Sequence, residues 1–149
     1  VTIDEMPVEF APVVVPLTTV ETDPAPVPAS VELAVETTTQ SLEDLAWARS
    51  GDKGDSANIG VIARHPAYLP YIWAALCPER VADVFAQETT GKIERFFLPG
   101  TQSMNILMHN ALGGGGIASL RNDAQGKGFA QKLLSVPVKI PAGLILNSN

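Results

Sequence analysis

The distribution of glycine and of basic residues divides this chain into two unlike parts. Residues 1–43 contain no Lys, no Arg and no Gly, but eight Asp or Glu and six Pro. From Asp44 onward, ten basic residues stand against eight acidic ones. We therefore expect one folded domain over residues 42–141, preceded by a Pro-rich acidic arm or interdomain linker at residues 1–41 and followed by a tail at residues 142–149.

The arm is predicted to run as short extended pieces, because each proline removes a backbone donor and biases the preceding residue toward extended geometry. Residues 24–28, with three prolines in five positions, are expected to form a stiff polyproline-like spacer. The valine-rich segments 13–15 and 31–35 could pair as edge strands or lie against a partner. The arm is thus either an interdomain connector or a docking arm for another subunit.

Composition excludes several classes of protein. The formal net charge of −6 belongs to the arm, and the folded part is nearly neutral with no basic stripe, which argues against nucleic-acid binding. The apolar runs fall short of the roughly 20 residues that a membrane span requires. Val1 opens into acidic residues without a secretory pattern, and Cys77 is the only cysteine, so no intrachain disulfide can form. We expect a cytoplasmic protein.

Hydrophobic patterning predicts strands that alternate with helices. Helices are expected to begin at Pro70, at Pro78 and, with Asp123 as N-cap, near the end of the chain. The charge-free apolar segment 104–112 is predicted to be a buried helix. Strands are expected at residues 42–50, 58–64, 92–98, 117–120 and 136–140. This order indicates an α+β fold, a two-layer ferredoxin-like sandwich whose mixed or antiparallel sheet has helices on one face.

The richest candidate for chemistry is the polar loop at residues 49–58. Its glycines allow consecutive backbone N–H groups to face an anion, while its charged and amide side chains could bind or activate a substrate. The alternative is a tight turn with local ion pairs. The candidate binding residues are Arg49, Ser50, Gly51, Lys53, Gly54, Ser56 and Asn58, and the candidate acids or bases are Asp52 and Asp55.

The second candidate is the run of four glycines that follows Leu112. Four glycines carry a large entropic cost on folding, so we expect a steric reason for them, such as backbone N–H groups that approach a phosphate, a carboxylate or a thioester oxygen. A helix C-cap followed by a mobile hairpin is the alternative. Arg121 could clamp a carboxylate or a phosphate beside this loop. The candidate residues are Gly113, Gly114, Gly115, Gly116 and Arg121.

The two histidines differ in their surroundings. His65 precedes Pro66 and is expected to be an exposed turn residue. His109 is expected in the apolar helix beside the glycine run, either as a satisfied core residue or as a catalytic base. Cys, His and carboxylates nowhere show the spacing of metal ligands, so neither a metal nor a cofactor is predicted.

Two long and compositionally unusual stretches resemble a known family. They are ARSGDKGDSANIGVIAR at residues 48–64, and ALGGGG at residues 111–116 with SLRNDAQGK at residues 119–127. Both are similar to the small C-terminal domain of the acyclic terpene utilisation (AtuA) family. The resemblance covers residues 42 to about 140 and implies a ferredoxin-like fold. It also implies that the two loops share one site.

The resemblance further implies a place in bacterial acyl-CoA catabolism, in the breakdown of acyclic terpenes or branched-chain acids, with a hydratase- or dehydratase-type reaction. The implied partner is a large AtuA-type domain or subunit in a homo- or hetero-oligomer, and the implied ligand is an acyl-CoA or a small carboxylate. No cofactor is implied beyond the CoA thioester, which is the candidate substrate.

Three functions remain open from the sequence. In an acyl-CoA enzyme, the glycine run would cradle the thioester oxygen and Asp52, Asp55 or His109 would act as base. In an accessory domain, the same loops would bind the large subunit or a CoA phosphate, and the chemistry would lie elsewhere. In a small-molecule sensor, Arg49 and Arg121 would hold a carboxylate ligand.

Overall fold

The computed structural model describes residues 2–3, 6–7, 26–29, 31–32 and 36–144 of the chain. Near the N-terminus, β1 (Thr2–Ile3) pairs with β2 (Met6–Pro7). The valine-rich segment 13–15, most of segment 31–35 and part of segment 24–28 lie outside the described residues, so the predictions made for them stay open.

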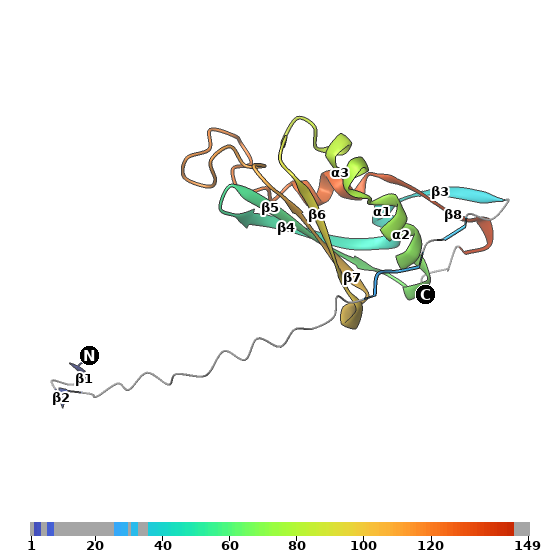
Figure 1. Cartoon of the computed structure of the whole chain (residues 1–149), viewed down its shortest axis with the longest axis horizontal. Coiled ribbons are helices and arrows are strands. Elements are labelled where there is room, and N and C mark those ends of the chain that lie inside the picture. The colour runs from blue at the N-terminus through green and yellow to red at the C-terminus, as the bar shows by residue number, and fades with distance from the viewer. Residues whose placement is uncertain (1, 4–5, 8–25, 30, 33–35, 145–149) are drawn as a thin grey trace.

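The centre of the domain is a four-stranded antiparallel sheet (Figure 1). Its strand order, β4-β5-β7-β6, places two hairpins side by side. The β6–β7 hairpin turns through the short helix η2 (Pro99–Thr101). The strands are β4 (Ala46–Lys53), β5 (Ser56–Ala63), β6 (Ile93–Leu98) and β7 (Ser103–Met108).

The helices cover one face of this sheet (Figure 1). A 3₁₀ turn, η1 (Pro66–Tyr68), leads into α2 (Leu69–Ala75), and α3 (Pro78–Val84) follows. Both helices carry proline in the first turn, where no backbone donor is needed, and these predicted helix starts are confirmed. With α4 (Phe129–Leu134), they complete the two-layer α+β sandwich that the sequence predicted.

The core lies between the helices and alternate residues of the strands. On β5, Ala57, Ile59 and Val61 are at most 1% exposed, and Met104, Ile106 and Met108 of β7 face the same side. Phe85 and Leu133 add fully buried side chains to this core from the helix side.

Arg95 of β6 ties α2 to the sheet. Its guanidinium stacks 3.6 Å from the centre of the Trp73 ring and donates to the Leu76 carbonyl. Burial lowers the pKa of this guanidinium.

A separate two-stranded ribbon stands beside the main sheet. It is formed by β3 (Thr37–Ser41) and β8 (Pro137–Pro141), which pair antiparallel. Val138 and Ile140 of β8 are fully buried and anchor the ribbon to the core. A final 3₁₀ turn, η3 (Ala142–Leu144), follows.

The predicted strand at residues 42–50 is correct only in its second part. Leu42–Leu45 form the single helical turn α1, and β4 begins at Ala46. Leu42 and Leu45 are 0% and 2% exposed. Their spacing of three residues places both on one side of a helical turn, and this burial decides the local conformation.

The predicted helix at residues 104–112 is wrong. Residues 103–108 form strand β7, in which Met104, Ile106 and Met108 point into the core while Asn105 and Leu107 alternate with them. A short apolar run fits a buried helix or a central strand equally well. Residues 103–108 pair with both β5 and β6, and this pairing makes the segment a central strand.

Two expectations near the end of the chain also fail. Residues 117–120 form a turn followed by irregular chain rather than a strand, with Ala118 and Ser119 donating to the Gly115 carbonyl. Asp123 is not the N-cap of α4, because that position belongs to Gly128. Its carboxylate instead accepts the N–H groups of Lys127 and Gly128 at 2.8 Å each, which shapes the approach to the helix. The final predicted strand is confirmed as β8.

Candidate functional site

The β4–β5 turn and the glycine run are held together by one aspartate. The backbone carbonyl of Asp55 accepts the N–H groups of Ala111 and Leu112 at 2.9 and 3.0 Å. Its Oδ1 accepts the N–H of Gly114 at 2.6 Å. We call this pair, residues 53–56 and 113–116, the joined loops. The sequence expected both loops to carry function, and the structure places them in direct contact.

Steric crowding explains why glycine is needed in this contact. Gly115 has φ +85°, and a Cβ there would lie 2.8 Å from the carbonyl oxygen of Gly54. Gly113 and Gly114 also have positive φ, at +66° and +102°. Side chains at these positions would strain the backbone and push the joined loops apart. The glycine run therefore has a structural reason that does not depend on a ligand.

Arg121 closes the segment that follows the joined loops. Its Nη1 donates to the carbonyls of Ala111 and Glu88, the latter at 2.8 Å. This nitrogen is therefore committed to the fold rather than free to clamp a ligand. Between Gly116 and Arg121, the side chains of Ile117 and Leu120 are 108% and 102% exposed, so the segment presents two apolar side chains to solvent.

No described element covers the sheet surface opposite the helices. We call it the open face. Register places its side chains in rows across the strands, roughly 4.8 Å apart from strand to strand. By register it consists of Trp47, Arg49, Gly51, Lys53, Ser56, Asn58, Gly60, Ile62, Glu94, Phe96, Leu98, Ser103, Asn105 and Leu107.

One edge of the open face, beside the joined loops, is cationic. Arg49 and Lys53 are exposed on β4, which is an edge strand. Lys127 reaches the same strand: a Cβ at Gly51 would lie 3.2 Å from its Nζ. Gly51 thus leaves room for this ammonium group. Sequence reasoning missed Lys127, because only its position around the strand edge brings it to Arg49 and Lys53.

The centre of the open face holds a hydrogen-bonded pair of amides. Asn58 Nδ2 donates to Asn105 Oδ1 at 2.9 Å, between strands β5 and β7. Ser50, another candidate, is 6% exposed and lies away from this surface. Its Oγ donates to the Lys127 carbonyl at 3.1 Å and accepts the N–H of Ala130 at 3.0 Å. Ser50 therefore anchors α4 to β4.

His109 lies directly after β7, where its ring bonds a carboxylate. His109 Nε2 is 2.6 Å from Glu94 Oε2, and Lys92 Nζ is 2.7 Å from Glu94 Oε1. The Lys92 hydrogen bond, and then that of His109, hold the pKa of Glu94 below its ordinary value. Glu94 therefore orients the imidazole, as carboxylates do for catalytic histidines. No local pattern in the sequence indicates this pairing.

Gly91 fixes the backbone at this histidine. A Cβ on Gly91 would lie 2.1 Å from the His109 carbonyl oxygen, so no other residue fits without movement. Thr89 Oγ1 donates to the same oxygen at 2.6 Å. His65, by contrast, is exposed at the start of η1, and its Nδ1 accepts the Ala67 N–H at 3.2 Å, in agreement with the predicted turn role.

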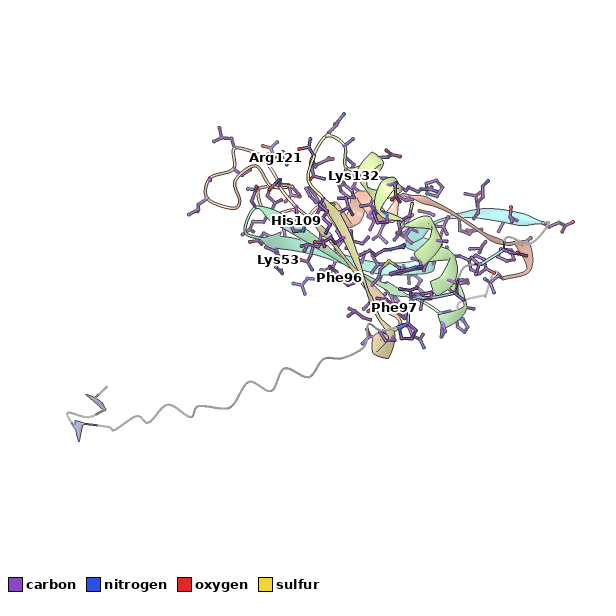
Figure 2. The ribbon with its side chains drawn as sticks, viewed as in Figure 1. Lys53, Phe96, Phe97, His109, Arg121 and Lys132 are labelled. Carbon is purple, nitrogen blue, oxygen red and sulfur yellow. The ribbon has the colours of Figure 1, made fainter. Side chains whose placement is uncertain are left out.

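The remaining candidate residues are placed as follows by the structure. Lys53, His109 and Arg121 lie toward the end of the molecule that carries the β4–β5 turn (Figure 2). The backbone carbonyl of Asp52 accepts a hydrogen bond from the Lys53 ammonium group at 2.9 Å. Gly54 and Ser56 belong to the β4–β5 turn, and Gly116 ends the glycine run. In the part of the chain that is described, no cluster of His, Cys, Asp or Glu could hold a metal ion.

Comparison with known families agrees with this architecture. The model of the AtuA ferredoxin-like domain matches residues 40–139, about two thirds of the chain. The chain belongs to this family. The match begins within β3 and ends within β8, so this AtuA ferredoxin-like domain includes the joined loops and the open face. Neither a curated protein nor a solved structure gives a significant match. Among the described helices, none has the length and apolarity to cross a membrane.

Proposed function

We propose that this AtuA ferredoxin-like domain completes the active site of an acyl-CoA enzyme by docking on a large AtuA-type domain or subunit. The open face is the docking surface, and the joined loops are its contribution to a composite site. The reaction is of the hydratase or dehydratase type, and the substrate is a branched-chain or terpene-derived acyl-CoA.

The observation that carries this proposal is the apolar part of the open face. Trp47, Ile62, Phe96 and Leu98 are 46–53% exposed on one sheet surface. Contiguous exposed apolar side chains on a sheet mark an interaction surface. Beyond the joined loops, Ile117 and Leu120 are exposed as well, so this segment offers a partner two further apolar side chains.

The cationic edge supports binding of the CoA part of the substrate. Arg49 and Lys53 lie on β4, which leads into the joined loops, and Lys127 Nζ lies beside Gly51 of the same strand. Cationic side chains of this kind suit phosphate oxygens. His109, oriented by Glu94, is the better candidate base. Asp55 already uses a carboxylate oxygen to hold Gly114.

Calorimetric titration with CoA and with a branched-chain acyl-CoA, for the chain alone and with the large subunit, tests the proposal. We expect binding that weakens in Lys53→Ala and Arg49→Ala. Trp47→Ser should reduce association with the large subunit, whereas Ala86→Ser, an exposed control on the helix side, should not. Association that is unchanged in Trp47→Ser and Phe96→Ser would contradict the docking surface.

One observation favours a second candidate, a non-catalytic accessory domain. The backbone and the side chain of Asp55 are both committed to joining the loops. Asn can replace its carboxylate as hydrogen-bond acceptor but not as a base. Turnover by the assembled enzyme that survives Asp52→Asn, Asp55→Asn and His109→Gln would place the chemistry entirely in the large domain.

A further inference from the structure

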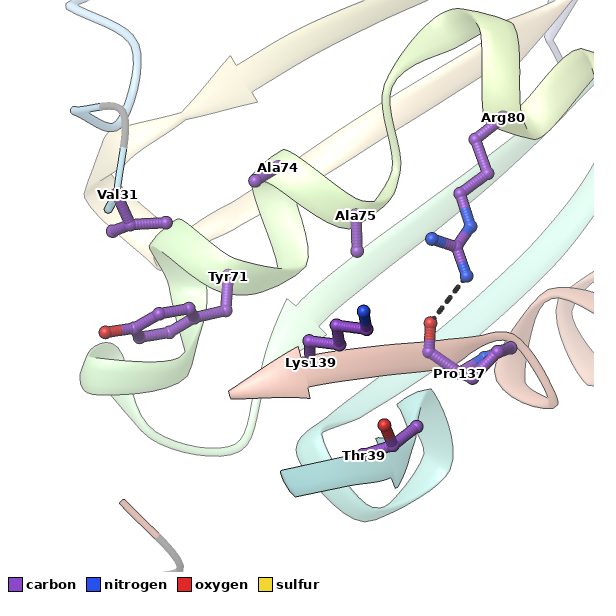
Figure 3. A pocket seen from close by; sticks show the side chains of 8 residues that line it. All are labelled: Val31, Thr39, Tyr71, Ala74, Ala75, Arg80, Pro137 and Lys139. Carbon is purple, nitrogen blue, oxygen red and sulfur yellow. Dashed lines mark hydrogen bonds between the residues drawn. The ribbon is translucent and has the colours of Figure 1, made fainter. Parts of the chain in front are cut away.

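A pocket lies away from the joined loops, between the helices and the β3–β8 ribbon (Figure 3). Its volume of about 440 Å³ is within the range of small-molecule sites. It is lined from α2, α3, β3 and β8, together with Val31 of the arm, and no residue of the open face or the joined loops borders it. The proposed function makes no use of it.

The charged groups of this pocket are all cationic. Arg80 and Lys139 line it, and none of its lining residues is acidic. Arg80 Nη2 donates to the Pro137 carbonyl at 2.7 Å, which fixes the guanidinium while its other N–H groups stay unused by the described residues. The ammonium group of Lys139 makes no side-chain hydrogen bond or ion pair with the described residues, while the backbone of Lys139 belongs to the β3–β8 pairing. In Figure 3 the Lys139 ammonium points up toward Ala75 of α2, and the Arg80 guanidinium lies beside it, next to Pro137.

The remaining walls are small and mostly apolar. Ala74 and Ala75 on α2, with Val31 and Pro137, give an aliphatic surface. Their small side chains leave the space that a larger residue would fill. Thr39, which pairs with Lys139 across the ribbon, and Tyr71 add hydroxyl groups at the border.

We propose that this pocket binds a small amphipathic anion, with the head group between Arg80 and Lys139 and an aliphatic tail along α2. Two uncompensated cations beside an apolar wall fit such a ligand, because the head group gains charge-assisted hydrogen bonds and the tail leaves water. The head group is a carboxylate or a phosphate monoester. The site is independent of acyl-CoA binding at the joined loops.

Calorimetric titration of the full chain with octanoate, octyl phosphate and neutral octanamide tests this. We expect at least one anion to bind, and the tighter of the two identifies the head group, while octanamide binds far more weakly. Lys139→Met keeps the aliphatic stem and should weaken binding about tenfold through loss of one charge-assisted contact. Lys92→Met, whose side chain is 72% exposed and does not line the pocket, is the matched control and should not change it.

A second variant fills the pocket without touching the core. Ala74 is exposed, and Ala74→Leu should block the tail while the thermal unfolding midpoint stays near that of the wild type. Amide shifts in the NMR spectrum should move at Ala75 and Lys139 on binding, and not at Lys53. Absence of binding, equal binding of octanamide, or equal affinity in Lys139→Met and Lys92→Met would each overturn the proposal.

Discussion

The two faces of the four-stranded sheet use the same strands for opposite purposes. On β5, Ile59 is fully buried against the helices, whereas Ile62, three residues later, is 47% exposed on the open face. The helix-covered face is a closed core of mostly aliphatic and sulfur-containing side chains, completed by Arg95 and Phe97, which pack against Trp73. The open face combines apolar side chains at one end with cations, amides and an oriented histidine toward the other. One face therefore supplies stability, and the other stays exposed and is the surface that we propose for docking.

Ile59→Ala should show the largest effect on stability. Truncating a fully buried side chain on the inner strand β5 leaves a cavity, and we expect the free energy of unfolding to fall by about 3 kcal/mol. Urea denaturation followed by circular dichroism measures this. A loss below about 1 kcal/mol would mean that the helix-covered face is not the stabilising one.

Gly115→Ala should have the next largest effect. The new Cβ would meet the Gly54 carbonyl oxygen at 2.8 Å, at a residue with φ +85°. We expect a loss of about 1–3 kcal/mol and faster hydrogen exchange at the amides of Ala111 and Leu112. Gly100→Ala is the matched control, since nothing lies within 4 Å of its Cβ position. Unchanged exchange in Gly115→Ala would contradict a tight contact between the joined loops.

Ile62→Ala is the direct counterpart of Ile59→Ala. Because the side chain is about half exposed, we expect a loss of less than about 1 kcal/mol in unfolding free energy. Association with the large AtuA-type subunit should weaken, and size-exclusion chromatography with titration would measure that. A stability loss equal to that of Ile59→Ala would remove the distinction between the two faces.

The smallest expected effect is on the pH dependence of the melting temperature, and it concerns Glu94. Hydrogen bonds from Lys92 and His109 hold the folded-state pKa of Glu94 below its ordinary value of 4.5. A depressed carboxyl pKa stabilises the fold above the unfolded pKa, and this contribution is lost as pH falls through the folded pKa. The difference in melting temperature between wild type and Glu94→Gln should therefore shrink below pH 4.5. A difference that stays constant down to pH 2 would contradict it.

Local patterns predicted most of the framework. Proline in the first turn predicts the helices α2 and α3, and short apolar runs predict the strands β5, β6 and β8. Each of these features lies within a few residues of sequence. The prediction of a helix from Met104 to Met108 is wrong, because a short apolar segment has no periodicity that separates a helix from a central strand. The prediction of a strand at residues 117–120 is also wrong, because Ala118 and Ser119 donate to the Gly115 carbonyl and close a turn there.

The candidate site was predicted in part. The polar loop and the glycine run were singled out from composition, and they do meet through Asp55. The position of Lys127 at Gly51 and the bond between Glu94 and His109 were not predicted. Both contacts join residues that are far apart in sequence or separated by a whole hairpin, so no local pattern reports them.

By itself, the sequence determined the α+β class of the domain and its family, because these depend on composition, periodicity and uninterrupted stretches of residues. The tertiary structure decided which face of the sheet stays open, which cations gather beside Gly51, and that four glycines serve a close contact between two loops. Those outcomes depend on strand register and on the packing of distant segments. A shift of one residue in register would move every side chain of a strand to the opposite face.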